Sequence, residues 1–358
     1  MTVLLTITIL ILTGIALWQI TKIFELSQIG LKKDDSQIAT EKDNDLNGKL
    51  MFAFLVFIYL VTIYCFWAYT KVLLPESASE HGAIYDTLLW VSFAIILFAQ
   101  TITQAVLHYF AYKYRGINNR KAYFFTHDNK LELIWTVIPA IIFFVLIIYG
   151  MITWGQIMNF GEEDEDDLVV ELYAQQWNWK ARYGGLDNVL GDANVRFLND
   201  FDGKNAVGID SSDPNGMDDF VVTQEFHLPV NRKVIFKMRS QDVLHSAYMP
   251  HFRAQMNCVP GMITEFSFTP TITTEEMRQN SDVVAKVNRI NKIRYDKSQK
   301  LISKGEEGLD SYQFDYLLLC AKICGTSHFN MQMKIIVESE KDYKKWAVQQ
   351  QTFSEIIQ

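Results

Sequence analysis

The sequence predicts a membrane-embedded α-helical N-terminal half followed by an all-β soluble domain. Two observations lead to this fold class. Long apolar runs dominate the chain up to about residue 155, whereas the sequence beyond Phe160 is acidic, rich in turn residues and made of short alternating segments. The chain has 358 residues and a net charge of -8, and its mean hydropathy lies close to zero. That average combines two unlike parts, so we expect about two domains.

Each of the four apolar runs is long enough to cross a bilayer, which takes about 20 residues. They cover roughly residues 3–24, 50–73, 87–112 and 131–154. One such run could be a buried core helix, but four of them predict a multi-pass membrane protein. The first run could instead be a secretory signal, yet MTVLLTITIL has no basic residue and LSQIG is a poor cleavage site. We therefore predict that it is a retained helix.

The loops between the runs predict the orientation of the helices, because Lys and Arg collect on the cytoplasmic side. The loop 113–130 holds five Lys or Arg residues, whereas the loop 74–86 holds three acidic residues and neither Lys nor Arg. The loop 25–49 adds four lysines. We therefore expect a protein of the inner (cell) membrane, with the soluble domain and both termini on the periplasmic side.

The soluble half contains short segments rich in β-branched and aromatic residues, which is typical of strands in an antiparallel sandwich or barrel. These segments are LVVELYAQQWNW, KVIFKMRS, EFSFTPTIT, YLLLCAKICG and MQMKIIVES. Two stretches do not fit the strand pattern. Residues 187–219 are rich in Gly, Asn and Asp, and residues 275–311 place Val283, Val287 and Ile290 at helical spacing among many charges. The second stretch predicts a surface helix inserted between strands.

The segment CAKICGTSHFNM, residues 320–331, brings four metal-ligand side chains into twelve positions. Thiolate and thioether sulfurs favour Cu(I) or zinc, and imidazole suits both metals. A structural zinc site would instead show paired C-x2-C motifs. A single blue copper needs one Cys and two His, so two cysteines fit two coppers bridged by both sulfurs. The second histidine would be His245 in DVLHS, which we expect in the loop after the strand KVIFKMRS.

Other interpretations of these residues stay open on chemistry alone. Two cysteines four positions apart on the oxidising side of a membrane often form a disulfide. A histidine after a strand is usually a surface residue. A thioredoxin-like copper chaperone also uses C-x3-C, but there a proline follows, whereas Gly325 follows here. A disulfide-stapled membrane anchor without redox chemistry is a further alternative.

Taken together, the motifs resemble subunit II of the haem–copper cytochrome c oxidases over roughly residues 85–340. CAKICGTSHFNM with DVLHS is similar to the family's binuclear copper A site. HDNKLELIWTVIPA (127–140) resembles the start of its second membrane helix, QWNW (176–179) its aromatic segment, and PTITTEEM (270–277) a strand-end sequence. The resemblance implies a cupredoxin-like Greek-key sandwich for the soluble domain. A quinol-oxidase subunit II shares that fold but lacks the copper ligands.

The resemblance implies that six residues hold two copper ions, with both sulfurs bridging and the thioether as a weak ligand. They are His245, Cys320, Lys322 through its backbone carbonyl, Cys324, His328 and Met331. The family usually has a glutamate at the middle position, where it helps to bind Mg²⁺ or Mn²⁺. An ammonium group has no lone pair for a cation, and Gln255 and Asn257 also replace the family's usual lysine and aspartate. We therefore expect that the non-redox metal is missing.

Two further residues receive roles from the same resemblance. Trp177 matches the exposed tryptophan through which the family accepts electrons from cytochrome c, whereas Trp179 is expected in the core. Glu132 matches a glutamate at the mouth of a proton-uptake path into the catalytic subunit. A carboxylate in the first turn of a helix can also simply favour the helix dipole, and this alternative stays open for Glu132.

The resemblance implies a subunit of a respiratory oxidase that takes electrons from a c-type cytochrome and passes them to the haem of subunit I, where oxygen reduction is coupled to proton translocation. No C-x2-C-H motif for a covalent haem occurs. Expected partners are subunit I, other membrane subunits, lipid and a larger respiratory assembly or supercomplex, but not nucleic acid. The expected parts are an additional transmembrane hairpin (1–80), the family's hairpin (81–160), the copper A domain (161–340) and a C-terminal tail (341–358).

Overall fold

The computed structural model describes residues 2–29, 40–117, 120–121, 123–158, 166–185 and 187–358. The composition change near Phe160, most of the acidic run 162–167, and Lys32 and Lys33 of the first loop lie outside the described residues. The chain divides into two compact units. The first contains residues 1–70 and 94–135, and the second contains residues 71–93 and 136–358.

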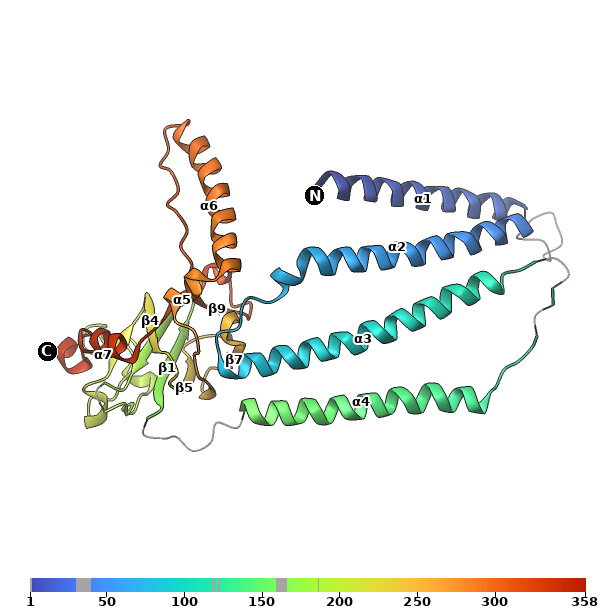
Figure 1. Cartoon of the computed structure of the whole chain (residues 1–358). Helices are drawn as coiled ribbons and strands as arrows, with labels where there is room; N and C mark the ends of the chain where they lie inside the picture. The colour runs from blue at the N-terminus through green and yellow to red at the C-terminus, as the bar shows by residue number, and fades with distance from the viewer. Residues whose placement is uncertain (1, 30–39, 118–119, 122, 159–165, 186) are drawn as a thin grey trace. The chain divides into compact units, whose positions relative to one another are not determined.

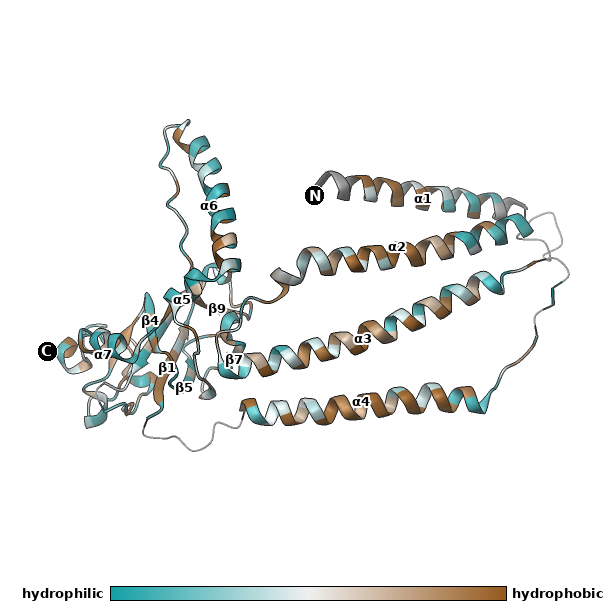
Figure 2. Ribbon diagram, in the orientation of Figure 1, coloured by the Kyte–Doolittle hydropathy of each residue, from teal (hydrophilic) through white to brown (hydrophobic). Residues whose placement is uncertain are grey.

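Four long helices make up the N-terminal half, as predicted (Figure 1). They are α1 (Thr2–Ile29), α2 (Glu41–Leu73), α3 (Glu80–Lys113) and α4 (Asn129–Met158). All four are long and apolar enough to cross a membrane, and Figure 2 shows that apolar residues cover most of α2, α3 and α4. Asp128 begins α4 by accepting hydrogen bonds from the backbone of Lys130 and Leu131 at 3.0 and 3.1 Å, which satisfies amides that a helix start leaves free.

Helices α2 and α3 contact each other within the first unit. The Arg115 guanidinium of the segment after α3 pairs with Asp45 of α2 at 2.7 Å. Further along, the Tyr59 hydroxyl donates to the carbonyl of Thr101 at 2.6 Å. These contacts attach α2, which the sequence marks as additional to the family's hairpin, to a helix that belongs to it.

The soluble domain is a sandwich of two five-stranded sheets, with strand orders β3-β2-β1-β5-β8 and β4-β10-β9-β6-β7. The strands of the first sheet are β1 (Leu168–Gln175), β2 (Asn178–Tyr183), β3 (Phe220–Val222), β5 (Val234–Ser240) and β8 (Thr264–Phe268). Those of the second sheet are β4 (Glu225–Pro229), β6 (His245–Met249), β7 (Ala254–Cys258), β9 (Tyr316–Cys320) and β10 (Gln332–Glu338).

Three predicted strands differ from the observed ones. The segment 168–179 folds as a hairpin, because β1 ends at Gln175 and pairs with Asn178 of β2 across a turn that contains Trp177. Strand β9 ends at Cys320, so the remaining metal-ligand residues lie in a loop. Strand β8 ends at Phe268, and Thr273 caps the short helix α5 (Thr274–Gln279) by accepting from the backbone of Glu276. The sequence PTITTEEM therefore begins a helix in its second half.

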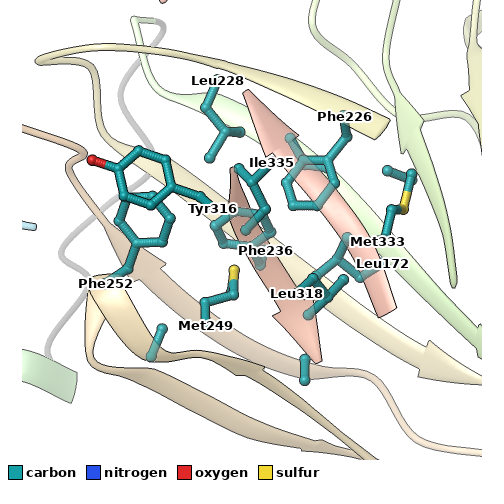
Figure 3. Close-up of a cluster of buried hydrophobic side chains, with 14 of the residues drawn as sticks. Leu172, Phe226, Leu228, Phe236, Met249, Phe252, Tyr316, Leu318, Met333 and Ile335 are labelled. Atoms are coloured by element: carbon teal, nitrogen blue, oxygen red, sulfur yellow. The ribbon is translucent and has the colours of Figure 1, made fainter. Parts of the chain in front are cut away.

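The core of the sandwich lies between the two sheets (Figure 3). Alternating residues of β10 produce one side of it, because Met333, Ile335 and Val337 are buried while Gln332 and Lys334 are exposed. Aromatic rings fill the centre, including Phe226, Phe236, Phe252 and Tyr316. Burial of each large apolar side chain contributes about 1.5–3 kcal/mol. This packing holds the ends of the strands in fixed positions.

A buried ion-pair network fixes the acidic segment 187–219 to the first sheet. The Arg182 guanidinium of β2 pairs with Glu171 of β1 at 3.0 Å and with Asp219 at the end of the segment. It also donates to the carbonyl of Gly191. Within the segment are two 3-10 turns, η2 (Val195–Phe197) and η3 (Pro214–Gly216), and no longer element is present among its described residues.

The predicted inserted helix is present as α6 (Ser281–Ile302), which the segment 303–315 follows back to β9 (Figure 1). The segment expected as a tail forms α7 (Glu340–Val348) and α8 (Phe353–Ile357). The Trp346 ring of α7 stacks on His227 of β4 with the ring centroids 4.1 Å apart. The remaining 3-10 turns are η4 (Pro250–Phe252) and η5 (His328–Asn330).

Candidate metal centre

Two strands and one loop bring the predicted ligand residues together at one end of the second sheet. His245 is the first residue of β6, and β6 pairs with β9, whose last residue is Cys320. The loop then returns, and the amide of Cys320 donates to the carbonyl of Met331 at 3.1 Å. The prediction that His245 lies in a loop was wrong: it lies in a strand, where pairing with Cys258 fixes its backbone.

Five side-chain donor atoms form a connected cluster. The Cys320 Sγ lies 3.8 Å from the His245 Nδ1 and 3.8 Å from the Cys324 Sγ. The Cys324 Sγ lies 3.7 Å from the His328 Nδ1 and 3.8 Å from the Met331 Sδ. Among the described residues, His245, Cys320 and Cys324 are the group of His, Cys and acidic side chains whose ligand atoms all lie within 4.8 Å of one another.

These separations fit metal binding. Bonds from a transition-metal ion to sulfur and nitrogen are about 2.3 and 2.0 Å long, so donor atoms 3.7–3.8 Å apart can share one ion. A disulfide needs its sulfurs about 2.05 Å apart, whereas Cys320 and Cys324 are both free. Two thiolates, two imidazoles and a thioether form a soft donor set that favours copper.

His245 is oriented by Asp242, a residue that the sequence analysis did not single out. The Nε2 of His245 lies 2.9 Å from the Asp242 carboxylate, while the Nδ1 faces Cys320. A carboxylate at Nε2 holds the proton there and leaves the lone pair of Nδ1 for a metal. The ring is completely buried. Asp242 stands in the quoted DVLHS, so the sequence contained a signal three positions before the histidine.

The backbone and the side chain of Lys322 have different surroundings. Its carbonyl oxygen lies 3.2 Å from the Cys320 Sγ and thus faces the cluster, whereas the side chain is exposed. The exposed Gln255 and Asn257 lie on β7, the neighbour of β6. The lysine side chain therefore occupies none of the space between the donor atoms.

The thiols of two buried cysteines at or near the site, Cys324 and Cys258, have raised pKa values. Burial, followed by the nearby Cys320 sulfur, raises the pKa of the Cys324 thiol to about 11. Burial raises the pKa of the Cys258 thiol to about 12, which suits its place in the apolar core. A bound metal cation stabilises thiolates and displaces their protons, so the loop is chemically suited to a cation rather than to free thiolates.

The turn that contains Trp177 packs against the metal loop. The Gln176 side chain donates to the carbonyl of Cys324 at 2.6 Å, and its amide donates to Asp242 at 2.8 Å. Trp177 is 39% exposed, so part of the residue reaches solvent. A Cβ added to Gly325 would lie 3.0 Å from the Trp177 Nε1, which shows how closely the loop approaches the ring. Gln176 and Gly325 are contacts that the sequence analysis did not identify.

Trp179 differs from Trp177. It is 1% exposed, and its ring lies edge-on to the His245 ring with centroids 6.2 Å apart. It thus packs beneath the cluster as the core residue that was predicted. Glu132 is remote from the cluster in sequence and lies in the first turn of α4, where its carboxylate is 3.7 Å from the exposed His127 Nδ1.

Comparison with known proteins decides the family. Residues 75–152 match the transmembrane domain of cytochrome c oxidase subunit II, and residues 168–289 match its periplasmic domain. The chain is also 30% identical to an alternative cytochrome c oxidase subunit 2 of Bradyrhizobium diazoefficiens, over 80% of this chain and 86% of that protein. The chain belongs to the cytochrome c oxidase subunit II family.

More distant relatives of this subunit II include the cytochrome c oxidase subunit 2 of Cereibacter sphaeroides, which is 24% identical over 71% of this chain and 72% of that protein. Among solved structures, the periplasmic domain of subunit II of a Bradyrhizobium japonicum cytochrome oxidase is 16% identical and covers 52% of this chain and 94% of that one, with a TM-score of 0.30.

Family membership identifies the chain as a membrane subunit of an oxidase complex, with its β-sandwich as the periplasmic domain. It also implies a copper A site, and the cluster described above is where the described residues could hold a metal. The family match of the periplasmic domain ends at residue 289, within α6 and before the loop 320–331. Helices α1 and α2 precede the matched residues.

Proposed function

We propose that this subunit II is the point at which electrons enter the oxidase. In this proposal a binuclear copper A centre accepts electrons from a c-type cytochrome and passes them to the haem of subunit I, for oxygen reduction coupled to proton translocation. The observation that carries the proposal is the connected set of two thiols, two imidazoles and a thioether at separations of 3.7–3.8 Å. Its proposed ligands are His245, Cys320, the Lys322 carbonyl, Cys324, His328 and Met331.

Copper in such a site supplies a reversible one-electron acceptor. The protein contributes rigidity, because His245 begins a strand and Cys320 ends one. The loop 321–331, which holds the other proposed ligands, is closed by the backbone bond from Cys320 to Met331. Asp242 holds the tautomer of His245, and Gln176 holds the carbonyl of Cys324. A donor set held in one arrangement limits the reorganisation that accompanies a change of charge.

Trp177 is the residue that we propose as the site of electron input. Its partly exposed ring packs against Gly325, the residue after Cys324. An aromatic side chain between solvent and the metal loop offers electronic contact to a docked donor. Trp179 is buried beneath His245 and is therefore not accessible to a donor.

We propose Glu132 as the mouth of a proton-uptake path. It lies in the first turn of α4 and keeps 45% of its side chain exposed, so it can exchange protons with water. The Lys- and Arg-rich loop 113–130 supports our proposal that this end of α4 lies on the cytoplasmic side, with both termini on the periplasmic side. The proposed partners are subunit I, other membrane subunits and a respiratory supercomplex.

We also propose that this subunit lacks the non-redox Mg²⁺ or Mn²⁺ site that the family usually has beside the copper A loop. The only ligand that Lys322 directs at the cluster is its carbonyl, and its exposed ammonium repels a dication. Gln255 and Asn257 on β7, which stand where the family often has lysine and aspartate, are uncharged and do not offset the repulsion. The ammonium group can pair with a carboxylate of the catalytic subunit instead.

Metal analysis and electron paramagnetic resonance of the purified complex test the copper proposal and the Lys322 proposal. We expect two copper ions for each copy of this chain, in addition to those of the other subunits, and a seven-line mixed-valence signal. We expect no stoichiometric Mg or Mn at the contact between this subunit and subunit I. Cys324→Ser should abolish the signal, whereas the matched control Cys65→Ser, which changes an exposed cysteine of α2, should keep it. A colourless domain with an oxidised disulfide would refute the copper proposal, and bound Mg or Mn would refute the Lys322 proposal.

A further inference from the structure

Helix α6 carries a row of cations along one side. At about 100° of rotation per residue, Lys286, Arg289, Lys297 and Lys300 lie within a sector of about 80°. We call these four residues the basic stripe. With a rise of about 1.5 Å per residue, the stripe extends over about 21 Å. Asp282 stands at its N-terminal end and Asp296 stands beside it.

Other parts of the chain pack against one side of α6 and form hydrogen bonds with its polar side chains. Val283 is buried and Val287 packs against the core of the sandwich. Further along, the returning segment 303–315 covers the helix, because the Asn291 side chain exchanges two hydrogen bonds with the backbone of Tyr312, at 3.0 and 2.7 Å. Ser298 bonds the backbone of Leu309 in the same way. The basic stripe is therefore not needed to hold α6 in place.

The basic stripe has no intramolecular counterion in the part of the chain that the structure describes. Helix α6 contains six Lys or Arg residues and two Asp residues, in a protein whose net charge is -8. Arg294, which is not part of the basic stripe, donates a hydrogen bond to the carbonyl of Asp310 and so helps to hold the returning segment. The four stripe cations make neither an ion pair nor a side-chain hydrogen bond within the described residues. A concentration of unpaired cations on an acidic protein points to an anionic partner.

The distribution of exposed apolar residues on α6 favours a protein over a membrane surface as the partner of the basic stripe. Ile293 is 57% exposed and lies in the middle of the basic stripe, which gives the apolar centre and charged rim of a protein interface. The other exposed apolar residues of α6, Val284, Tyr295 and Ile302, lie on the opposite flank, about 170° away. A helix that lies in a membrane interface buries an uninterrupted apolar face in the lipid, whereas the flank of Val284, Tyr295 and Ile302 adjoins the side of α6 where Asn291 and Ser298 are covered by the segment 303–315.

We propose that the basic stripe of α6 is a docking surface for another protein of the respiratory assembly, one that presents a row of carboxylates about 21 Å long with an apolar contact for Ile293. The interface uses none of the proposed copper ligands, and two of its four cations, Lys297 and Lys300, lie beyond residue 289, where the family match ends. A contact built on exposed charges weakens with salt, because the screening length falls from about 8 Å at physiological salt to about 3 Å at 1 M.

The test labels lysine amines in three preparations of the oxidase: native membranes, detergent-purified complex, and purified complex in nanodiscs that contain one quarter phosphatidylglycerol. A zero-length carboxyl-to-amine cross-linker is applied to the native membranes, and the linked peptides are identified by mass spectrometry. The stripe variant is Lys286→Gln, Arg289→Gln, Lys297→Gln and Lys300→Gln. The control variant Asn288→Glu, Lys292→Glu and Gln299→Glu removes the same four units of charge from the other flank.

We expect labelling of the stripe lysines to be at least fivefold lower in native membranes than in the other two preparations, and to recover at 1 M salt. Cross-links should join the stripe to Asp or Glu residues of a different chain, should survive in the control variant and should disappear in the stripe variant. Equal labelling in all three preparations would overturn the proposal. Protection in the anionic nanodiscs would identify a membrane surface instead, and cross-links to the segment 187–219 of a second copy would identify self-association.

Discussion

The two ring nitrogens of His245 have different neighbours, and this difference prepares the residue for metal binding. Its Nε2 meets a carboxylate at 2.9 Å, and its Nδ1 faces a sulfur at 3.8 Å. The same carboxylate of Asp242 also accepts from the backbone of Gln176 and of Val243. Those hydrogen bonds lower the pKa of Asp242 against the effect of burial, so it stays ionised and keeps the proton on Nε2.

Removal of this carboxylate should therefore weaken the metal site. We expect Asp242→Ala to lower copper affinity by about 10–100-fold, the usual effect of losing the partner of a metal-binding imidazole. Competition with a copper chelator on the purified complex measures it. Asp296→Ala, which removes an exposed carboxylate of α6, serves as the control. If both variants keep the affinity of the unmodified subunit, Asp242 has no role in orienting His245.

Trp177 should affect the rate of electron input without affecting copper content. Trp177→Leu removes the aromatic ring but keeps an apolar side chain next to Gly325, so we expect electron transfer from reduced cytochrome c to slow by roughly tenfold, which equals about 1.4 kcal/mol in the barrier. Trp177→Phe should restore much of the rate. Stopped-flow reduction of the copper absorption measures both. An unchanged rate in the leucine variant would disprove the assignment.

At the scale of elements, the loop 321–331 and the β1–β2 turn act as one unit. Gly325 has φ of +138°, a conformation that L-residues rarely adopt. A Cβ there would lie 3.0 Å from the Trp177 Nε1 and 3.1 Å from the Gln176 Nε2. The glycine is thus required both for its backbone conformation and for the close approach of the turn.

Substitution of Gly325 should separate the effect of backbone strain from the effect of losing the close contact with the β1–β2 turn. Gly325→Ala is expected to destabilise the domain by about 1–3 kcal/mol through backbone strain, and also to release copper by pushing the turn away. Gly305→Ala is the control, because Gly305 has φ of +81° but open space around it. It should lower the denaturation temperature without loss of copper. Equal copper content in both variants would show that the contact with the turn does not support the metal loop.

The sequence predicted the elements but not all of their ends. The four helices followed from apolar runs, and α6 followed from its helical spacing, because both are properties of local sequence. The β1–β2 hairpin was missed because QWNW carries no glycine or proline to mark a turn. The copper ligands were predicted from residue type, spacing and the family resemblance, and they stay a prediction. Asp242 and Gln176 were missed because their roles depend on contacts between residues as far apart as 176 and 324.

Turn η4 joins the periplasmic domain to the segment between α2 and α3 through His251. Its Nδ1 bonds the carbonyl of Glu76 at 2.9 Å, and its ring packs edge-on against Phe314 and Tyr316. Burial, together with the nearby charges of Lys286 and Arg253, lowers the pKa of His251 from 6.5 to about 4. The folded state therefore binds this proton less tightly than the unfolded state does.

This pKa shift predicts acid sensitivity of the junction. The contribution of neutral His251 is fully present above pH 6.5 and is lost as the pH falls toward 4, by at most about 3 kcal/mol. His251→Gln keeps a donor for the Glu76 carbonyl and cannot be protonated. We expect the denaturation temperature of the variant complex to fall less between pH 7 and pH 5 than that of the unmodified complex. Parallel curves would contradict the assignment.

At the scale of the whole molecule, chemistry and additional membrane anchoring lie in different parts of the chain. All six proposed copper ligands belong to the second compact unit, whereas α1 and most of α2 belong to the first. The family match begins at residue 75, after both of these helices. The described contacts of α2, such as Asp45 with Arg115 and Tyr59 with Thr101, involve α3 and the segment after it rather than the β-sandwich.

Large apolar side chains remain exposed along α1 and α2, among them Trp18, Phe57 and Trp67. Because the family match begins after both helices, they are additional to the matched transmembrane domain, and we predict that they hold neighbouring membrane subunits or a larger assembly. Deletion of residues 2–70 should leave the copper signal unchanged and should remove at least one partner from the complex in native gels and mass spectrometry. The copper signal proves that the truncated chain is folded and inserted. A truncated complex that keeps both the signal and every partner would show that α1 and α2 are dispensable for assembly.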